Sequence, residues 1–61
     1  MILKLRVNFK FGYYRVYADC ITSERICMLM RRTNYTKDEI GYLRDLGYKI
    51  KFSGDLENFD W

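Results

Sequence analysis

The sequence predicts an α+β fold, a single small domain with the element order β-β-α-α-β. Three observations carry this prediction. Residues 2–9 and 13–18 alternate apolar and polar side chains, which is typical of strands with one buried face. Residues 22–32 and 36–46 space apolar side chains three and four positions apart, as amphipathic helices do. Residues 48–52 return to alternation, which predicts a third strand.

The first two strands are expected to form an antiparallel hairpin whose register follows from the alternation. The apolar face would pair Phe9 with Tyr14, Val7 with Val16, Leu5 with Ala18 and Leu3 with Cys20. The polar face would pair Lys10 with Tyr13, Asn8 with Arg15, Arg6 with Tyr17 and Lys4 with Asp19. A shift of one residue would bury Arg15 and Tyr17. A two-residue loop requires a positive φ at Phe11, which is costly, so a four-residue loop over 10–13 is favoured.

The first helix is predicted over residues 22–32. Thr22 or Ser23 would cap its first turn, because hydroxyl side chains accept hydrogen bonds from free N–H groups there. Its apolar stripe consists of Ile26, Leu29 and Met30, which fall on one side of a helix and would face the core.

The second helix follows an interruption at residues 33–35. Thr36 and Glu39 have the spacing of a capping box, and Gly47 is placed to end the helix in the left-handed conformation. Its predicted apolar stripe is Ile40, Leu43 and Leu46.

The third strand is expected to turn three apolar side chains inward and two lysines outward. The inward residues are Tyr48, Ile50 and Phe52, and the outward residues are Lys49 and Lys51. Since each helix has one apolar side, both helices should cover the same face of the sheet. Which hairpin strand the third strand joins is left open.

The composition argues against an enzyme. The chain has no histidine, which is the commonest general base near neutral pH and the commonest metal ligand. Two cysteines, Cys20 and Cys27, are too few for a thiolate zinc site. We therefore expect no catalytic residue, no cofactor and no metal. The two thiols are expected to be reduced and apolar in character, with a bridge between them left open.

The expected location is cytoplasmic. No stretch approaches the 18 or so consecutive apolar residues that a membrane-spanning helix needs. The first ten residues alternate cations with apolar side chains, unlike the continuous apolar core of a signal peptide.

The formal net charge is +3, and the charged residues are distributed unevenly along the chain. Residues 1–17 hold four bases and no acid, whereas residues 53–61 hold three acids and no base. On the predicted sheet, the uncovered face would carry the basic side chains Lys4, Arg6, Lys10, Arg15, Lys49 and Lys51. Tyr13, Tyr17 and Asn8 would lie among them, with Asp19 as the one acid.

This surface has three interpretations. A solvated antiparallel face is ordinarily polar, and its residues can serve as cross-strand pairs. Cations on a bare face also suit an acidic protein partner. Cations interleaved with aromatic rings suit a nucleic acid, whose bases stack while its phosphates meet the cations.

The domain is taken to span residues 1–61, with residues 53–61 as an acidic and aromatic tail. Leu56, Phe59 and Trp61 could fold back to enlarge a small core. In the alternative interpretation the tail docks to a partner, because aromatic residues are enriched in protein interfaces. Its acids could also cover the basic face of the same chain.

These observations predict a small non-enzymatic protein that docks to a larger intracellular protein and modulates it, with inhibition favoured and recruitment left open. In size and composition the chain is similar to the small inhibitors that phages and mobile elements use against host enzymes or defence systems, a similarity without a diagnostic motif. The predicted partner-binding residues are Arg6, Tyr13, Arg15, Tyr17, Lys49, Lys51, Phe59 and Trp61. The alternatives are a nucleic-acid-binding module that uses the same face and a homodimer.

Overall fold

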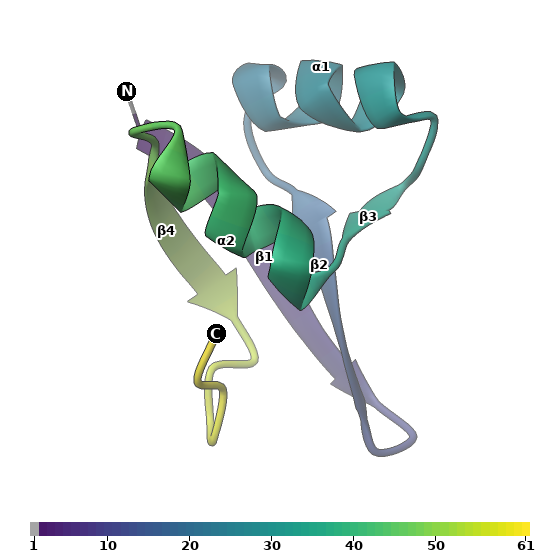
Figure 1. Cartoon of the computed structure of the whole chain (residues 1–61). Coiled ribbons are helices and arrows are strands. Elements are labelled where there is room, and N and C mark those ends of the chain that lie inside the picture. The colour runs from purple at the N-terminus through teal and green to yellow at the C-terminus, as the bar shows by residue number, and fades with distance from the viewer. Residues whose placement is uncertain (1) are drawn as a thin grey trace.

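The computed structural model describes residues 2–61 and shows one four-stranded sheet with two helices packed against it (Figure 1). The elements are β1 (Ile2–Lys10), β2 (Tyr13–Ala18), α1 (Ile21–Met30), β3 (Asn34–Tyr35), α2 (Lys37–Asp45) and β4 (Lys49–Gly54). The predicted order β-β-α-α-β is confirmed. A two-residue strand, β3, is added between the helices, where the sequence indicated only an interruption.

The strands lie in the order β3-β2-β1-β4. The hairpin register is as predicted from Leu5↔Ala18 to Lys10↔Tyr13. The two further expected pairs, Leu3 with Cys20 and Lys4 with Asp19, lie beyond the end of β2 and outside the ladder. β4 lies alongside β1 and runs parallel to it, whereas β3 pairs with β2 in the antiparallel sense.

The turn of the hairpin differs from the prediction. Lys10 and Tyr13 are paired, so the loop contains only Phe11 and Gly12. Both have positive φ, 53° for Phe11 and 80° for Gly12, which is the pattern of a type I′ turn. The prediction of a four-residue loop was therefore wrong. The tight turn is favoured because its backbone twist matches best the twist of the two strands.

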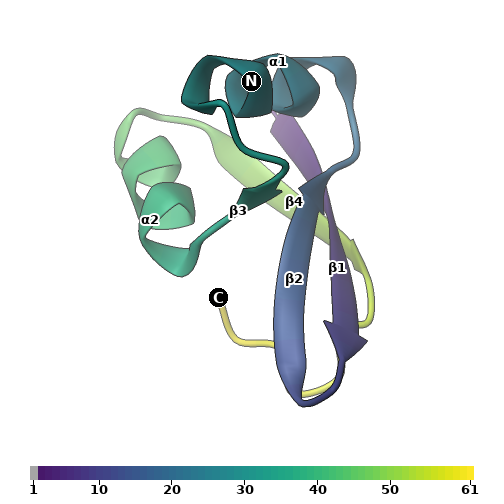
Figure 2. The ribbon, with the colours of Figure 1, turned by 90° about the vertical axis from the view of Figure 1, so that its right-hand side faces the viewer.

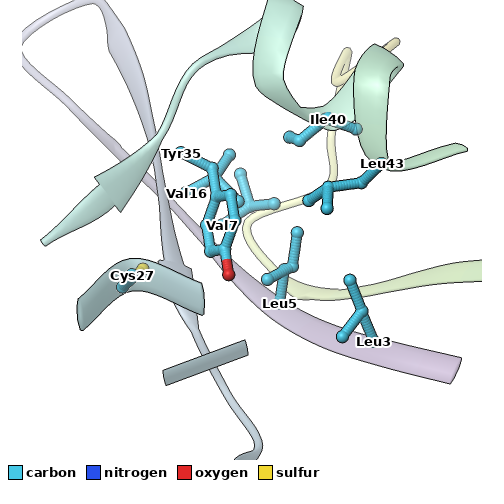
Figure 3. Packing of buried hydrophobic residues seen from close by; sticks show 8 residues of the cluster. All are labelled: Leu3, Leu5, Val7, Val16, Cys27, Tyr35, Ile40 and Leu43. Carbon is cyan, nitrogen blue, oxygen red and sulfur yellow. The ribbon is translucent and has the colours of Figure 1, made fainter. Parts of the chain in front are cut away.

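Both helices contribute to one hydrophobic core on one face of the sheet. In the turned view α2 lies beside the sheet, and α1 lies across its end (Figure 2). The core side chains come from both layers and converge (Figure 3). They are Leu3, Leu5, Val7, Val16, Cys27, Tyr35, Ile40 and Leu43. The predicted sheltering of one sheet face is confirmed.

The first helix begins earlier than predicted and is capped differently. Its N-cap is Cys20, and Ser23 lies inside the first turn. The fully buried Ser23 hydroxyl accepts hydrogen bonds from the backbone N–H groups of Asp19 and Cys20, each at 3.1 Å. It lies 3.0 Å from the Lys4 carbonyl oxygen, to which it donates. The cap was misplaced because Ser23 is held by a strand that is distant in sequence.

The predicted apolar stripe of α1 was also partly wrong. Leu29 is 84% exposed, and the residues that α1 buries are Ser23 and Cys27. Ile26 and Met30 are half-buried against the core. The helix ends at Met30 and is capped by Arg31, whose φ of 56° is left-handed, so the predicted end at residue 32 was two residues too late.

The second helix is capped as predicted. The Glu39 N–H donates to the Thr36 hydroxyl at 3.2 Å, and the Thr36 N–H donates to the Glu39 carboxylate at 2.8 Å. Gly47 adopts a φ of 101°, and Tyr48 N–H bonds back to the Leu43 carbonyl, which closes the helix end. Leu46 was wrongly assigned to the core. It lies beyond the last helical turn and is 75% exposed.

The side chains of the last strand, β4, lie on the predicted sides of the sheet. Tyr48, Ile50 and Phe52 are half-buried against the core, and Lys49 and Lys51 are exposed. Cys20 and Cys27 are both free thiols. Within residues 2–61 no helix is long and apolar enough to cross a membrane.

The tail after β4 folds back on the domain, as one of the two interpretations expected. The Phe59 ring packs edge-on against Tyr14 and Phe52, with ring centroids 5.3 and 4.9 Å away, and is tilted against Trp61 at 5.3 Å. The Tyr14 hydroxyl donates to the Glu57 carbonyl at 2.7 Å. These contacts enlarge a core that would otherwise end at the sheet.

Candidate functional site

The candidate site is the face of the sheet that the helices leave bare, here called the open face. Side chains alternate between the two faces of a strand, so the neighbours of each core residue in β1, β2 and β4 point to this side. Its basic members are Lys4, Arg6, Lys10, Arg15, Lys49 and Lys51, and all six are exposed. Its other predicted members, Tyr13 and Tyr17, are exposed and half-buried, respectively.

The parallel pairing of β4 with β1 concentrates the positive charge. Lys51 lies directly beside Lys4, and Lys49 lies beside Ile2. Like charges on neighbouring strands destabilise a sheet slightly. This arrangement could not be foreseen without the strand order, and among the ion pairs of residues 2–61 none involves Lys4 or Lys51.

One acidic side chain, Asp19, reaches this face. Its carboxylate lies 3.9 Å from the Arg6 guanidinium and 3.4 Å from the Ser53 hydroxyl. The expected neighbours Asp19 and Lys4 meet through the backbone, since the Asp19 N–H donates to the Lys4 carbonyl at 3.0 Å, but the Asp19 carboxylate contacts Arg6. Both side chains are substantially exposed, so the ion pair contributes little to stability and leaves Arg6 accessible.

The open face is hollowed near the hairpin turn. A shallow hollow of about 310 Å³ is lined by Asn8, Lys10, Phe11, Arg15 and Tyr17. Two cations and two aromatic rings therefore border the same depression. A smaller hollow of about 140 Å³ lies between Lys4, Asp19, Lys51 and Ser53.

Phe11 lines this surface but is not among the predicted partner-binding residues. Its side chain is 95% exposed at the tip of the hairpin, next to Tyr13, which is 68% exposed. The available signal was the pair Phe11-Gly12 in a place where turns ordinarily carry Asn-Gly or Asp-Gly.

The structure does not bring Phe59 and Trp61 to the open face. Both pack against the core on the side of the helices. The tail acids do not cover the basic face either, because the Asp55 carboxylate accepts a hydrogen bond from the Phe9 N–H at 2.9 Å. Among residues 2–61 the ion pairs are Arg6–Asp19 and Arg32–Glu39, and neither involves the tail. The predicted surface thus divides into an open face and a separate packed tail.

A polar cluster lies where β1 meets α1. The Cys20 thiol is 3.3 Å from the Ser23 hydroxyl and accepts from the Lys4 N–H at 3.4 Å. Burial by itself would raise the pKa of the Cys20 thiol, but these hydrogen bonds outweigh it and the pKa is lowered from its ordinary value. All the polar groups here serve the start of α1, so the cluster has a structural explanation.

Comparison with known proteins adds no functional assignment: no family model, no curated protein and no solved structure matches the chain.

Proposed function

We propose that the protein is a non-enzymatic binding module that docks its open face on an acidic surface of a larger cytoplasmic protein and inhibits that protein by covering the surface. The observation that carries the proposal is the gathering of six exposed cations on one bare sheet face that a single carboxylate, Asp19, approaches. The proposal assigns no catalytic, metal-binding or cofactor-binding residue. The binding residues are Arg6, Tyr13, Arg15, Tyr17, Lys49 and Lys51, joined by Lys4, which pairs with Lys51 across the strands.

The positive charge of the open face supports a partner whose contact surface is negatively charged. Complementary charge steers association and suppresses wrong partners. The side-by-side cations Lys4 and Lys51 would gain most, since a partner carboxylate placed between them relieves their mutual repulsion. Tyr13 and Arg15 supply residue types that carry much of the binding energy in protein interfaces.

The same charges argue against a homodimer built through the edge of the sheet. β4 is an edge strand, and its partner-free side could pair with β4 of a second copy. A two-fold antiparallel pairing centred on Ile50 would place Lys49 of one copy against Lys51 of the other. We therefore favour a partner of different sequence.

The test compares two double variants with equal changes in net charge. Arg15→Glu with Lys51→Glu reverses charge on the open face, whereas Arg25→Glu with Lys37→Glu reverses exposed charges on the helices. Tagged wild-type protein and both variants are used to capture partners from a nuclease-treated lysate of the source organism. We expect the wild-type protein and the helix variant to retain the same partner and the open-face variant to lose it. Equal retention by all three would refute docking through this face.

A second candidate function is binding of single-stranded nucleic acid by the same face. It is favoured by the hollow in which Arg15 lies beside Tyr17, because a base can stack on a ring while a phosphate meets the cation. The test is fluorescence anisotropy with a labelled dT20 strand and a mixed-sequence RNA at about 50 mM salt. Binding whose log K falls by roughly 0.7 per neutralised phosphate with log salt would support this function. No change in anisotropy would exclude it.

A further inference from the structure

The tip of the β1–β2 hairpin carries a phenylalanine that the fold does not need. Phe11 holds a φ of 53°, in the left-handed region that bulky side chains avoid. Its ring is 95% exposed, so no packing within the chain compensates for the strained backbone. The tight turn requires a left-handed backbone at this position but not a phenylalanine, and a strained residue with an exposed side chain is a reason to look for function there.

The surroundings of Phe11 indicate what the ring would meet. The turn lies at the end of the molecule away from α1 and projects beyond the helices (Figure 1 and Figure 2). Lys10 and Arg15 border the hollow that Phe11 helps to line. The apolar ring is therefore flanked by cations, and the complementary surface is apolar at its centre and acidic at its edge.

We propose that Phe11 is the anchor of the interface: the hairpin tip inserts this ring into an apolar pocket on the partner protein, and carboxylates at the rim of that pocket meet Lys10 and Arg15. This inference rests on the proposed function and adds the chemistry of the partner site. Tight type I′ geometry fixes the backbone of the tip before binding, so little backbone freedom is lost on docking.

The experiment first identifies the pocket. The photoreactive residue p-benzoylphenylalanine replaces Phe11 in one variant and Leu29 in a matched control, since Leu29 is an exposed apolar residue on α1. Both are irradiated in a nuclease-treated lysate, and the cross-linked peptides are mapped. We expect position 11, and not position 29, to cross-link to a partner segment that contains apolar residues and nearby Asp or Glu.

The second step measures affinity for the purified partner. Phe11→Asn is the decisive variant, because Asn-Gly is a preferred type I′ sequence and relieves the strain. We expect its melting temperature to rise by roughly 4–8 °C and its affinity to fall by roughly 30-fold or more. Leu29→Gln should leave the affinity unchanged.

The outcomes distinguish a failure of the Phe11 anchor from a failure of docking through the open face. If Phe11→Asn binds like the wild-type protein while Arg15→Glu with Lys51→Glu does not, the anchor is wrong and docking through the open face stands. If neither variant changes the affinity, both proposals fall. The anchor is also overturned if position 11 forms no cross-link to a protein, or if the melting temperature of Phe11→Asn falls together with its affinity.

Discussion

The covered and open faces of the sheet are built from the same strands and differ in nearly every physical respect. Along β1, Leu3, Leu5 and Val7 are fully buried, whereas the intervening Lys4 and Arg6 are exposed. The covered face is closed by two helices and by the aromatic tail. The open face has only its own side chains and solvent.

This difference separates stability from binding. On the covered face each side chain is fixed by close packing or by hydrogen bonds, so small changes in volume or polarity are costly. On the open face the fold leaves like charges side by side and an aromatic ring on a strained turn, neither of which adds to stability. Substitutions can test this separation, because they should weaken folding on one face and binding on the other.

The largest effect is expected from Gly54→Ala, compared with Gly12→Ala. Both glycines have positive φ, but a Cβ at Gly54 would lie 2.4 Å from the Val7 carbonyl oxygen, whereas a Cβ at Gly12 meets nothing within 4 Å. We expect Gly54→Ala to destabilise the fold by on the order of 3 kcal/mol and Gly12→Ala by about 1 kcal/mol. Urea unfolding measures both, and equal losses would mean that β4 is not held against β1 as described.

The next effect is expected from Ser23→Ala. This change removes the buried hydroxyl that accepts from the Cys20 N–H, and it should destabilise the fold by about 2 kcal/mol. Ser53→Ala is the matched control, since Ser53 is exposed and its hydroxyl contacts are no shorter than 3.4 Å. Its effect should stay within about 0.5 kcal/mol. Thermal melts that show similar losses for the two serines would contradict the role of Ser23.

A pH effect is expected from Tyr35 on the covered face. Burial and then the hydrogen bond with Cys27 raise the pKa of Tyr35 well above its ordinary value of 10.0. The unfolded chain ionises this tyrosine first, so its stabilising contribution is complete below pH 10 and is lost as the pH rises toward the pKa of the folded state.

The measurement is the stability difference between the wild-type protein and Tyr35→Phe. That difference should be constant up to about pH 9.5 and then shrink by up to about 1.4 kcal/mol per pH unit. Groups common to both proteins cancel in the difference. A stability difference that grows above pH 10 would mean that folding lowers the pKa of Tyr35 instead of raising it. Burial of the Tyr35 hydroxyl would then be wrong.

The smallest stability effect is expected on the open face and has the opposite sign. Lys51→Glu replaces the like-charged neighbour of Lys4 with an opposite charge and should stabilise the fold by about 0.5 kcal/mol at low salt. The same variant should bind the partner more weakly. A gain in stability that persists in about 1 M salt would mean that charge is not its cause.

Local sequence determined the elements whose signals are local. The strict alternation of residues 2–9 allowed one hairpin register, because a shift would have buried Arg15. Thr36 and Glu39 specified the start of α2, since a capping box needs only four consecutive residues. The same alternation placed the six cations on one face.

Tertiary structure decided the features in which distant segments meet. The N-cap of α1 could not be predicted, because Ser23 is buried against the Lys4 carbonyl of β1. The two residues of β3 form a strand only because the edge of β2 is free beside them. Phe11 accepts a left-handed backbone because pairing of the whole hairpin outweighs the preference of one residue.

The sequence by itself thus determined which side chains share a face, because alternation is a property of each strand alone. It did not determine that β4 lies parallel to β1, with Lys51 beside Lys4. β4 pairs with β1 because the helices and the aromatic tail pack over the same core, and the free energy of this burial depends on all of these segments together.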